Sequence, residues 1–164
     1  GREQEFEGEY RIMIPSPKVA TYDLQPTMSA QKVTEAYVKE IKTTKPDFIC
    51  LNYANPDMVG HTGDFDAVVK AVETIDNCIG DIIIESKKEN YVLVIIADHG
   101  NAEFMINKDG SPNTAHTTNK VPCFIVNSNY TSIQPGGLCD IAPTILKIMS
   151  IDIPKDMTTK VLID

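Results

Sequence analysis

Short apolar runs alternate with long amphipathic segments along this chain, and this alternation constrains the fold more than any other feature. Residues 48–54 and 91–97 are apolar runs of strand length, and a third run covers residues 121–126. Between the first two, apolar residues repeat at helical spacing over residues 64–88, with aspartates in the first turn and lysines at the end. That charge placement complements a helix dipole. Strands separated by a helix favour an α/β layered sandwich with a mostly parallel central sheet flanked by helices.

Weaker patterns complete the expected organisation. Val33, Tyr37 and Ile41 recur every four residues and predict an amphipathic helix over residues 30–43. The remaining signals predict strands at residues 10–14 and 104–106, a polar loop at 55–63 and a last helix at about 140–149. No repeat or internal domain boundary is evident, so we treat the chain as one unit.

Composition narrows the classes of partner. The chain has 164 residues, of which 42% are hydrophobic, the size of one ordinary domain or of a large piece of a bigger one. Its net charge of -8 argues against binding to nucleic acid or to an anionic membrane. The strongly apolar runs are far too short to cross a bilayer.

The cysteines and the first residues bear on the compartment. Cys50, Cys78, Cys123 and Cys139 stand singly among apolar neighbours, without a CxxC pair. We therefore expect buried, reduced thiols that act as small hydrophobic side chains. The first residues do not have the pattern of a secretory signal, so we expect a cytoplasmic protein.

All three histidines lie close to the predicted strand ends. Asp57 comes shortly after the first predicted strand, and His61 is four residues after Asp57. Asp98 and His99 directly follow the second strand, and His116 lies in the loop that precedes the third. Ligands of open α/β sheets bind beyond the carboxyl ends of the strands. The three imidazoles can therefore meet at one edge of the sheet.

Each of these groups alone has an ordinary explanation. Asp57 and His61 would share one side of a helical turn, but such pairs are common in solvated loops. Asp98 and His99 would point to opposite faces of a strand and can converge only where it ends, and Gly100 allows that turn. His116 alone is more typical of a hydrogen-bonded loop histidine than of a metal ligand.

Together, the five side chains predict a metal centre. A mixed set of imidazoles and carboxylates suits Zn²⁺ or Mn²⁺ better than Ca²⁺. Five ligands exceed the need of one catalytic ion and could hold two, which in phosphoryl transfer stabilise the attacking and the leaving oxygen. No serine or threonine occupies an obvious strand-to-helix elbow, so we expect no catalytic nucleophile in this chain.

Four ordered segments carry a resemblance to a known family. Residues 15–26 (PSPKVATYDLQP), 52–63 (NYANPDMVGHTG), 97–103 (ADHGNAE) and 114–119 (TAHTTN) strongly resemble cofactor-independent phosphoglycerate mutase, a member of the alkaline phosphatase superfamily. The resemblance runs from about residue 11 to the end of the chain. It implies an alkaline-phosphatase-like fold and an isomerase of glycolysis and gluconeogenesis that interconverts 3-phosphoglycerate and 2-phosphoglycerate.

The resemblance also implies roles for the candidate residues. Asp57, His61 and His116 match the ligands of one divalent ion, and Asp98 and His99 match ligands of a second ion. Manganese is the metal that the family typically uses, with Zn²⁺, Co²⁺ or Mg²⁺ as alternatives. The reaction passes through a transiently phosphorylated serine.

The family's chain is several times longer than this one, and this difference shapes the expectation. Residues 1–164 resemble only the C-terminal portion of a discontinuous phosphatase-like domain. An N-terminal portion with the serine nucleophile and a further metal-binding aspartate, and an inserted substrate-binding domain, have no counterpart here. We therefore expect the isolated chain to be inactive and to hold its metal weakly, and we assign it no substrate-binding residues and no oligomeric state.

Two other functions stay open on the sequence. One is a non-catalytic metal-binding module that kept the scaffold, and the other is a fragment of a related metal-dependent phosphatase or sulfatase. The coding sequence upstream of residue 1 distinguishes the mutase from the module. An in-frame segment with the metal-binding aspartate, the serine nucleophile and the active-site lysine that the family carries there favours the mutase, and a stop codon favours the module.

Overall fold

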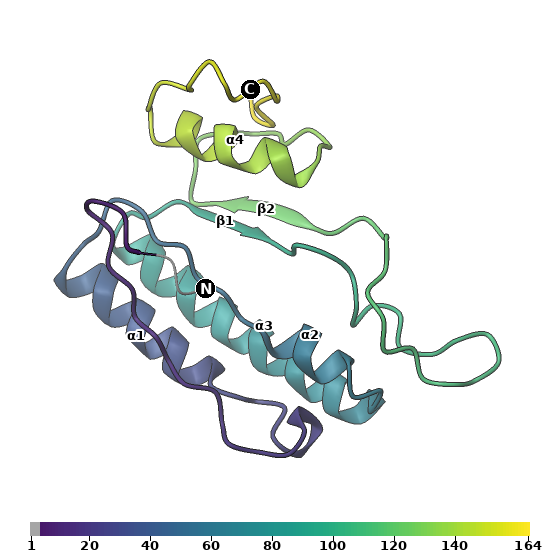
Figure 1. Ribbon diagram of the computed structural model, residues 1–164. Coiled ribbons are helices and arrows are strands. Elements are labelled where there is room, and N and C mark those ends of the chain that lie inside the picture. The colour runs from purple at the N-terminus through teal and green to yellow at the C-terminus, as the bar shows by residue number, and fades with distance from the viewer. Residues whose placement is uncertain (1–3) are drawn as a thin grey trace.

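The computed structural model describes residues 4–164, and its two long helices lie side by side (Figure 1). They are α1 (Ala30–Thr43) and α3 (Phe65–Lys88), so both predicted amphipathic helices are confirmed. Asp64 caps α3, since its carboxylate accepts a hydrogen bond from the Ala67 amide at 2.8 Å. Lys87 and Lys88 lie in the last turn, where positive charge is favoured by the helix dipole.

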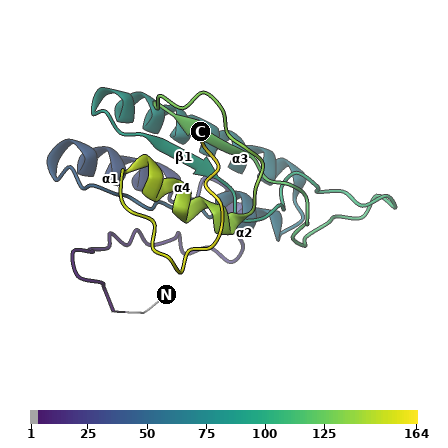
Figure 2. The same ribbon diagram turned by 90° about the horizontal axis from the view of Figure 1, so that it is seen from above.

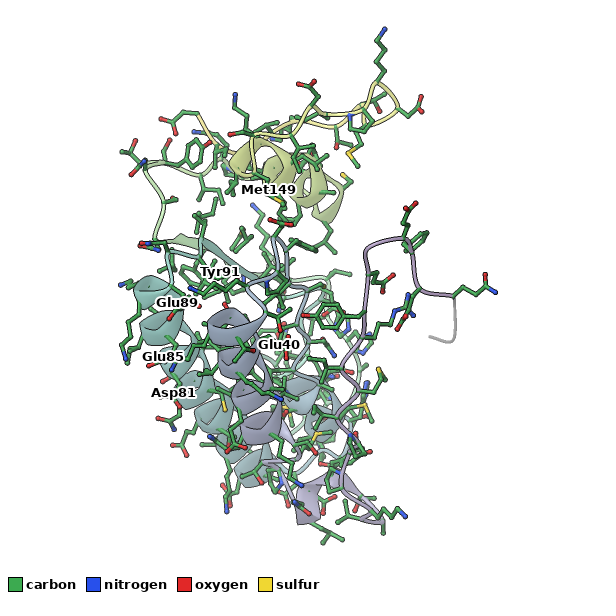
Figure 3. The ribbon with its side chains drawn as sticks, turned by 90° about the vertical axis from the view of Figure 1, so that its left-hand side faces the viewer. Glu40, Asp81, Glu85, Glu89, Tyr91 and Met149 are labelled. Carbon is green, nitrogen blue, oxygen red and sulfur yellow. The ribbon has the colours of Figure 1, made fainter. Side chains whose placement is uncertain are left out.

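The interface between α1 and α3 holds much of the core. Tyr37 and Ile41 of α1 pack against Ile82 of α3, and Ile41 is fully buried. The Tyr37 hydroxyl lies 2.7 Å from the Ser86 hydroxyl, which satisfies two buried polar groups. At the rim, Lys42 of α1 forms an ion pair with Glu85 of α3. Figure 3 shows Asp81 and Glu85 on α3 beside α1, with Glu89 just past the end of the helix.

The sheet differs from the prediction. Among residues 4–164 it has two strands, β1 (Leu93–Ile96) and β2 (Cys123–Val126), which pair antiparallel with Leu93 opposite Val126 and Ile96 opposite Cys123. The mostly parallel sheet is therefore not confirmed. A parallel pair needs a crossover, usually a helix, whereas the connection between β1 and β2 contains no helix and simply returns along the chain.

Other predicted strands are absent or reduced. Residues 10–14 and 48–54 form no strand, and Ile106 makes only an isolated bridge with Pro112. The 48–54 run has strand composition, but the described residues supply no neighbouring strand to pair with it, and Phe48 is 54% exposed.

The expectation of buried thiols holds only in part. Cys78 is buried in α3 and Cys123 is half-buried, and all four cysteines are free. Cys50 and Cys139 are exposed, contrary to the prediction. Cys50 lies in the unpaired 48–54 segment, and Cys139 lies in the 3₁₀ turn Leu138–Asp140 at the surface.

The elements form layers. Helix α4 (Ile141–Ile148) covers one side of the β1–β2 ribbon, and α1 and α3 lie on the other side (Figures 1 and 2). The short helix α2 (Asn55–Gly60) packs near the start of α3, and the connection between β1 and β2 projects from this end of the molecule (Figure 1). A further 3₁₀ turn covers Tyr22–Leu24. The layered α/β character is thus confirmed, and no helix of the described residues is long and apolar enough to span a bilayer.

Candidate metal centre

Helix α2 places Asp57 and His61 together. Pro56 stands in its first turn, where its fixed backbone favours helix initiation, and the Asn55 side chain anchors the helix by donating to the Pro26 carbonyl at 2.8 Å. His61 caps the other end, with its amide donating to the Asp57 carbonyl at 3.1 Å. The polar loop predicted at residues 55–63 is therefore largely a helix. Its single turn brings Asp57 Oδ1 to 3.2 Å from His61 Nε2.

The third histidine reaches the same carboxylate from the β1–β2 connection. His116 Nε2 lies 2.9 Å from Asp57 Oδ1 and 3.1 Å from His61 Nε2. Because β1 and β2 are antiparallel, the chain leaving β1 and the chain entering β2 occupy the same end of the ribbon. The histidines meet as predicted, but at the end of an antiparallel ribbon and not at the carboxyl edge of a parallel sheet.

The tautomer of His61 is set by a backbone group. Its Nδ1 lies 2.7 Å from the carbonyl oxygen of Thr114, which can only accept, so Nδ1 carries the proton. In the neutral ring Nε2 keeps its lone pair, and it lies 3.2 Å from Asp57 Oδ1 and 3.1 Å from His116 Nε2. A histidine that donates from one ring nitrogen to a backbone carbonyl and offers the other is the common arrangement at metal sites.

His99 completes the cluster, and Asp98 lies at its edge. The His99 ring stacks on that of His116 with centroids 3.7 Å apart, and His99 Nδ1 is buried without a hydrogen-bond partner among the described residues. Asp57, His99 and His116 each offer a ligand atom, and these atoms lie within 4.8 Å of one another. The Asp98 side chain is 81% exposed, and its Oδ2 lies 3.6 Å from His99 Nε2.

These distances suit a divalent cation. With bonds of about 2.1 Å and angles between about 90° and 109°, two ligands of one ion lie roughly 3.0–3.4 Å apart. The three separations among Asp57 Oδ1, His61 Nε2 and His116 Nε2 are 3.2, 2.9 and 3.1 Å. The carboxylate and imidazoles can therefore share one ion with little rearrangement, and His99 is near enough to join them or to serve a neighbouring ion.

The chain matches a known group of enzymes over nearly its whole length. Residues 1–153 match the Metalloenzyme superfamily. The chain belongs to this superfamily. Its candidate metal centre is thus consistent with the chemistry for which the superfamily is named.

The curated relatives that this chain resembles are phosphoglycerate mutases. The chain is 55% identical, over 163 residues, to a 2,3-bisphosphoglycerate-independent phosphoglycerate mutase of Flavobacterium psychrophilum, covering 99% of this chain and 32% of that protein. It is 53% identical, over 165 residues, to phosphoglycerate mutase 1 of the same type from Methanosarcina acetivorans, with the same coverage of both chains. The chain thus spans about a third of the length of these curated relatives.

A solved structure gives the same picture. The metalloenzyme fold superposes on a Leishmania mexicana phosphoglycerate mutase, crystallised at low cobalt concentration, with a TM-score of 0.83 and 28% identity. The match covers 92% of this chain and 31% of the other. The resemblance found in the sequence is therefore borne out in both sequence and fold.

Two residues of the candidate metal centre were not singled out from the sequence. The Asn101 amide nitrogen donates to Asp57 Oδ1 at 2.9 Å, and Glu103 accepts from the Asn101 backbone amide at 2.7 Å. Glu103 also accepts from the Thr117 hydroxyl, which lowers the pKa of its carboxyl group. Both residues lie in the segment 97–103, but nothing in the sequence indicates which of its polar side chains face the histidines.

Proposed function

We propose that residues 1–164 are the C-terminal portion of the phosphatase-like domain of a cofactor-independent phosphoglycerate mutase, which interconverts 3-phosphoglycerate and 2-phosphoglycerate. The observation that carries this proposal is the triangle of Asp57, His61 and His116, built on segments that resemble the mutase. The mutases of Flavobacterium psychrophilum and Methanosarcina acetivorans, each matched over 99% of this chain, support the same activity.

We assign two divalent ions to the complete protein, with Mn²⁺ as the first choice. Asp57, His61 and His116 would hold one ion, and Asp98 and His99 would contribute to the second. The short separations within the first set support the first ion. The second ion is supported by the 3.6 Å separation of His99 Nε2 and Asp98 Oδ2. Bound ions of this kind supply positive charge at a phosphoryl group and favour ionisation of an attacking hydroxyl.

The role of this chain is to present ligands rather than the nucleophile. A serine that takes and returns the phosphoryl group, and a further carboxylate ligand, are expected in the part of the protein that matches the remaining length of the relatives. The substrate is phosphoglycerate and the expected location is the cytoplasm, as for a glycolytic enzyme.

The test compares the complete protein with the 164-residue chain. Both are incubated with 3-phosphoglycerate and Mn²⁺, and the products are followed by phosphorus NMR, with a chelator-treated sample as the control. We expect 2-phosphoglycerate only from the complete, metal-loaded protein. Release of inorganic phosphate without isomerisation would instead indicate a phosphatase, and isomerisation by the isolated chain would refute its role as a ligand-bearing part.

A further inference from the structure

We infer that Asn101 is a positioning residue, whose carboxamide holds the Asp57 carboxylate in the orientation that metal binding requires. The inference rests on the proposed metal site and deepens it. Asn101 lies in the loop after β1 and is 4% exposed, whereas Asp57 lies on α2. The side-chain nitrogen Nδ2 of Asn101 lies 2.9 Å from Asp57 Oδ1 and 3.4 Å from the Asp57 carbonyl oxygen. One buried group therefore fixes both the side chain and the backbone of Asp57.

Asn101 differs chemically from the other neighbours of this carboxylate. When an ion binds, the His61 Nε2 atom, which lies 3.2 Å from Asp57 Oδ1, must offer its lone pair to the ion and cannot donate to the carboxylate. The His116 nitrogen that faces Asp57 must then offer a lone pair as well. The amide nitrogen of Asn101 can only donate, so it orients Asp57 without competing for the ion.

The surroundings of Asn101 fix the direction of its amide group. Its Oδ1 is buried and has no hydrogen-bond partner in the described chain, and it lies over Gly60, where an added Cβ would collide with it. The reversed amide would place this oxygen against the Asp57 carboxylate, which is repulsive. The observed orientation, with one acceptor left unpaired, is therefore maintained by the contact with Asp57.

The loop itself is tied to the segment that carries His116. One carboxylate oxygen of Glu103 accepts a hydrogen bond from the backbone N–H of Asn101 at 2.7 Å. The other oxygen accepts from the Thr117 hydroxyl and from Asn119 Nδ2, the latter at 3.0 Å. The Thr117 amide donates to the Gly100 carbonyl at 2.8 Å. Asn101 thus links α2 to a loop that already holds its position relative to His116.

The experiment measures metal binding by the complete protein and its Asn101→Ala and Asn101→Leu variants. Mn²⁺ is titrated and followed by electron paramagnetic resonance, and the visible absorption of the Co²⁺-saturated protein reports the ligand geometry. Asn107→Ala is the matched control, because Asn107 also donates from its amide, to Ser111 and to the Pro112 carbonyl, but away from Asp57. We expect both Asn101 variants to bind Mn²⁺ roughly 10–100-fold more weakly, with an altered Co²⁺ spectrum, and the control to match the wild type.

A third variant keeps the test decisive if removal of the buried amide prevents folding. Gly60→Ala retains the Asn101 side chain but displaces it, because the added Cβ would collide with its oxygen. This variant should weaken Mn²⁺ binding and change the Co²⁺ spectrum while the protein stays folded by circular dichroism. Wild-type affinity and an unchanged spectrum in the folded variants would overturn the role of Asn101 and leave the proposed metal site unaffected. If the wild-type protein binds no Mn²⁺, the proposed metal site fails, and this inference fails with it.

Discussion

Glu103 shows how much of the site depends on residues that touch no candidate ligand directly. Its carboxylate joins the loop after β1 to the segment before β2 by accepting from Asn101, Thr117 and Asn119. The Thr117 hydroxyl holds the pKa of Glu103 below its usual range. The ionised form of Glu103 therefore stabilises the folded arrangement.

This leads to a prediction for pH. Because the folded-state pKa of Glu103 is lowered, its contribution is present above the ordinary carboxyl pKa and is lost as the pH falls through the lowered value. Glu103→Gln should lower the free energy of unfolding at pH 7 by on the order of 1 kcal/mol or less, since the group is exposed, and the difference should vanish in acid. Thermal unfolding at several pH values measures it, with exposed Glu73→Gln of α3 as the control. A difference that does not change with pH would contradict the assignment.

The histidines could be located from the sequence, but their partners could not. The four-residue spacing of Asp57 and His61 and the position of His99 just after β1 are evident in the sequence, whereas His116 reaches them because the chain returns into an antiparallel β2. Asn101 and Glu103 sit in the same polar segment as several other side chains. Which of these side chains face the site depends on how residues 114–119 pack against the loop after β1, and the sequence does not show this packing.

At the scale of elements, the pair of α1 and α3 is the part of the fold that the sequence predicts best. Val33, Tyr37 and Ile41 have helical spacing, and α1 begins and ends at residues 30 and 43 as expected. The reason is that each helix has a single apolar stripe, which must be buried against another surface. The two stripes meet around Ile41 and Ile82.

The packing of α1 on α3 gives a stability prediction. Ile41 is fully buried between Tyr37 and Ile82, so Ile41→Ala should lower the free energy of unfolding by about 2–5 kcal/mol through lost burial and the cavity left behind. Urea denaturation followed by circular dichroism gives the value, with Lys39→Ala on the exposed side of α1 as the control. A loss as small as that of the control would show that this interface is not part of the cooperative core.

At the scale of the whole molecule, the sheet is what the sequence failed to predict. The 48–54 run has the composition of a buried strand, yet it lies unpaired, and β1 pairs only with β2 among residues 4–164. Strand pairing depends on neighbours that composition does not identify. The absence of a helix between residues 97 and 122 was the available signal that β1 and β2 would run antiparallel.

Under the proposed function, the rest of the complete protein supplies what these surfaces lack. Phe48 and Phe124, at 54% and 56% exposure, are the kind of apolar side chains that further strands or helices would cover. The chain spans about a third of its curated relatives. We therefore expect the nucleophile and the remaining metal ligand to come from that additional length.

Measuring the metal content of the complete protein tests whether Asp57, His61 and His116 hold an ion. Purified wild type, His61→Ala and His116→Ala are saturated with Mn²⁺, separated from free ion and analysed by mass spectrometry for metal bound per chain, alongside mutase activity. Each substitution removes one corner of the triangle with Asp57, so bound metal and activity should fall together in both variants. Unchanged metal content in both variants would contradict the account.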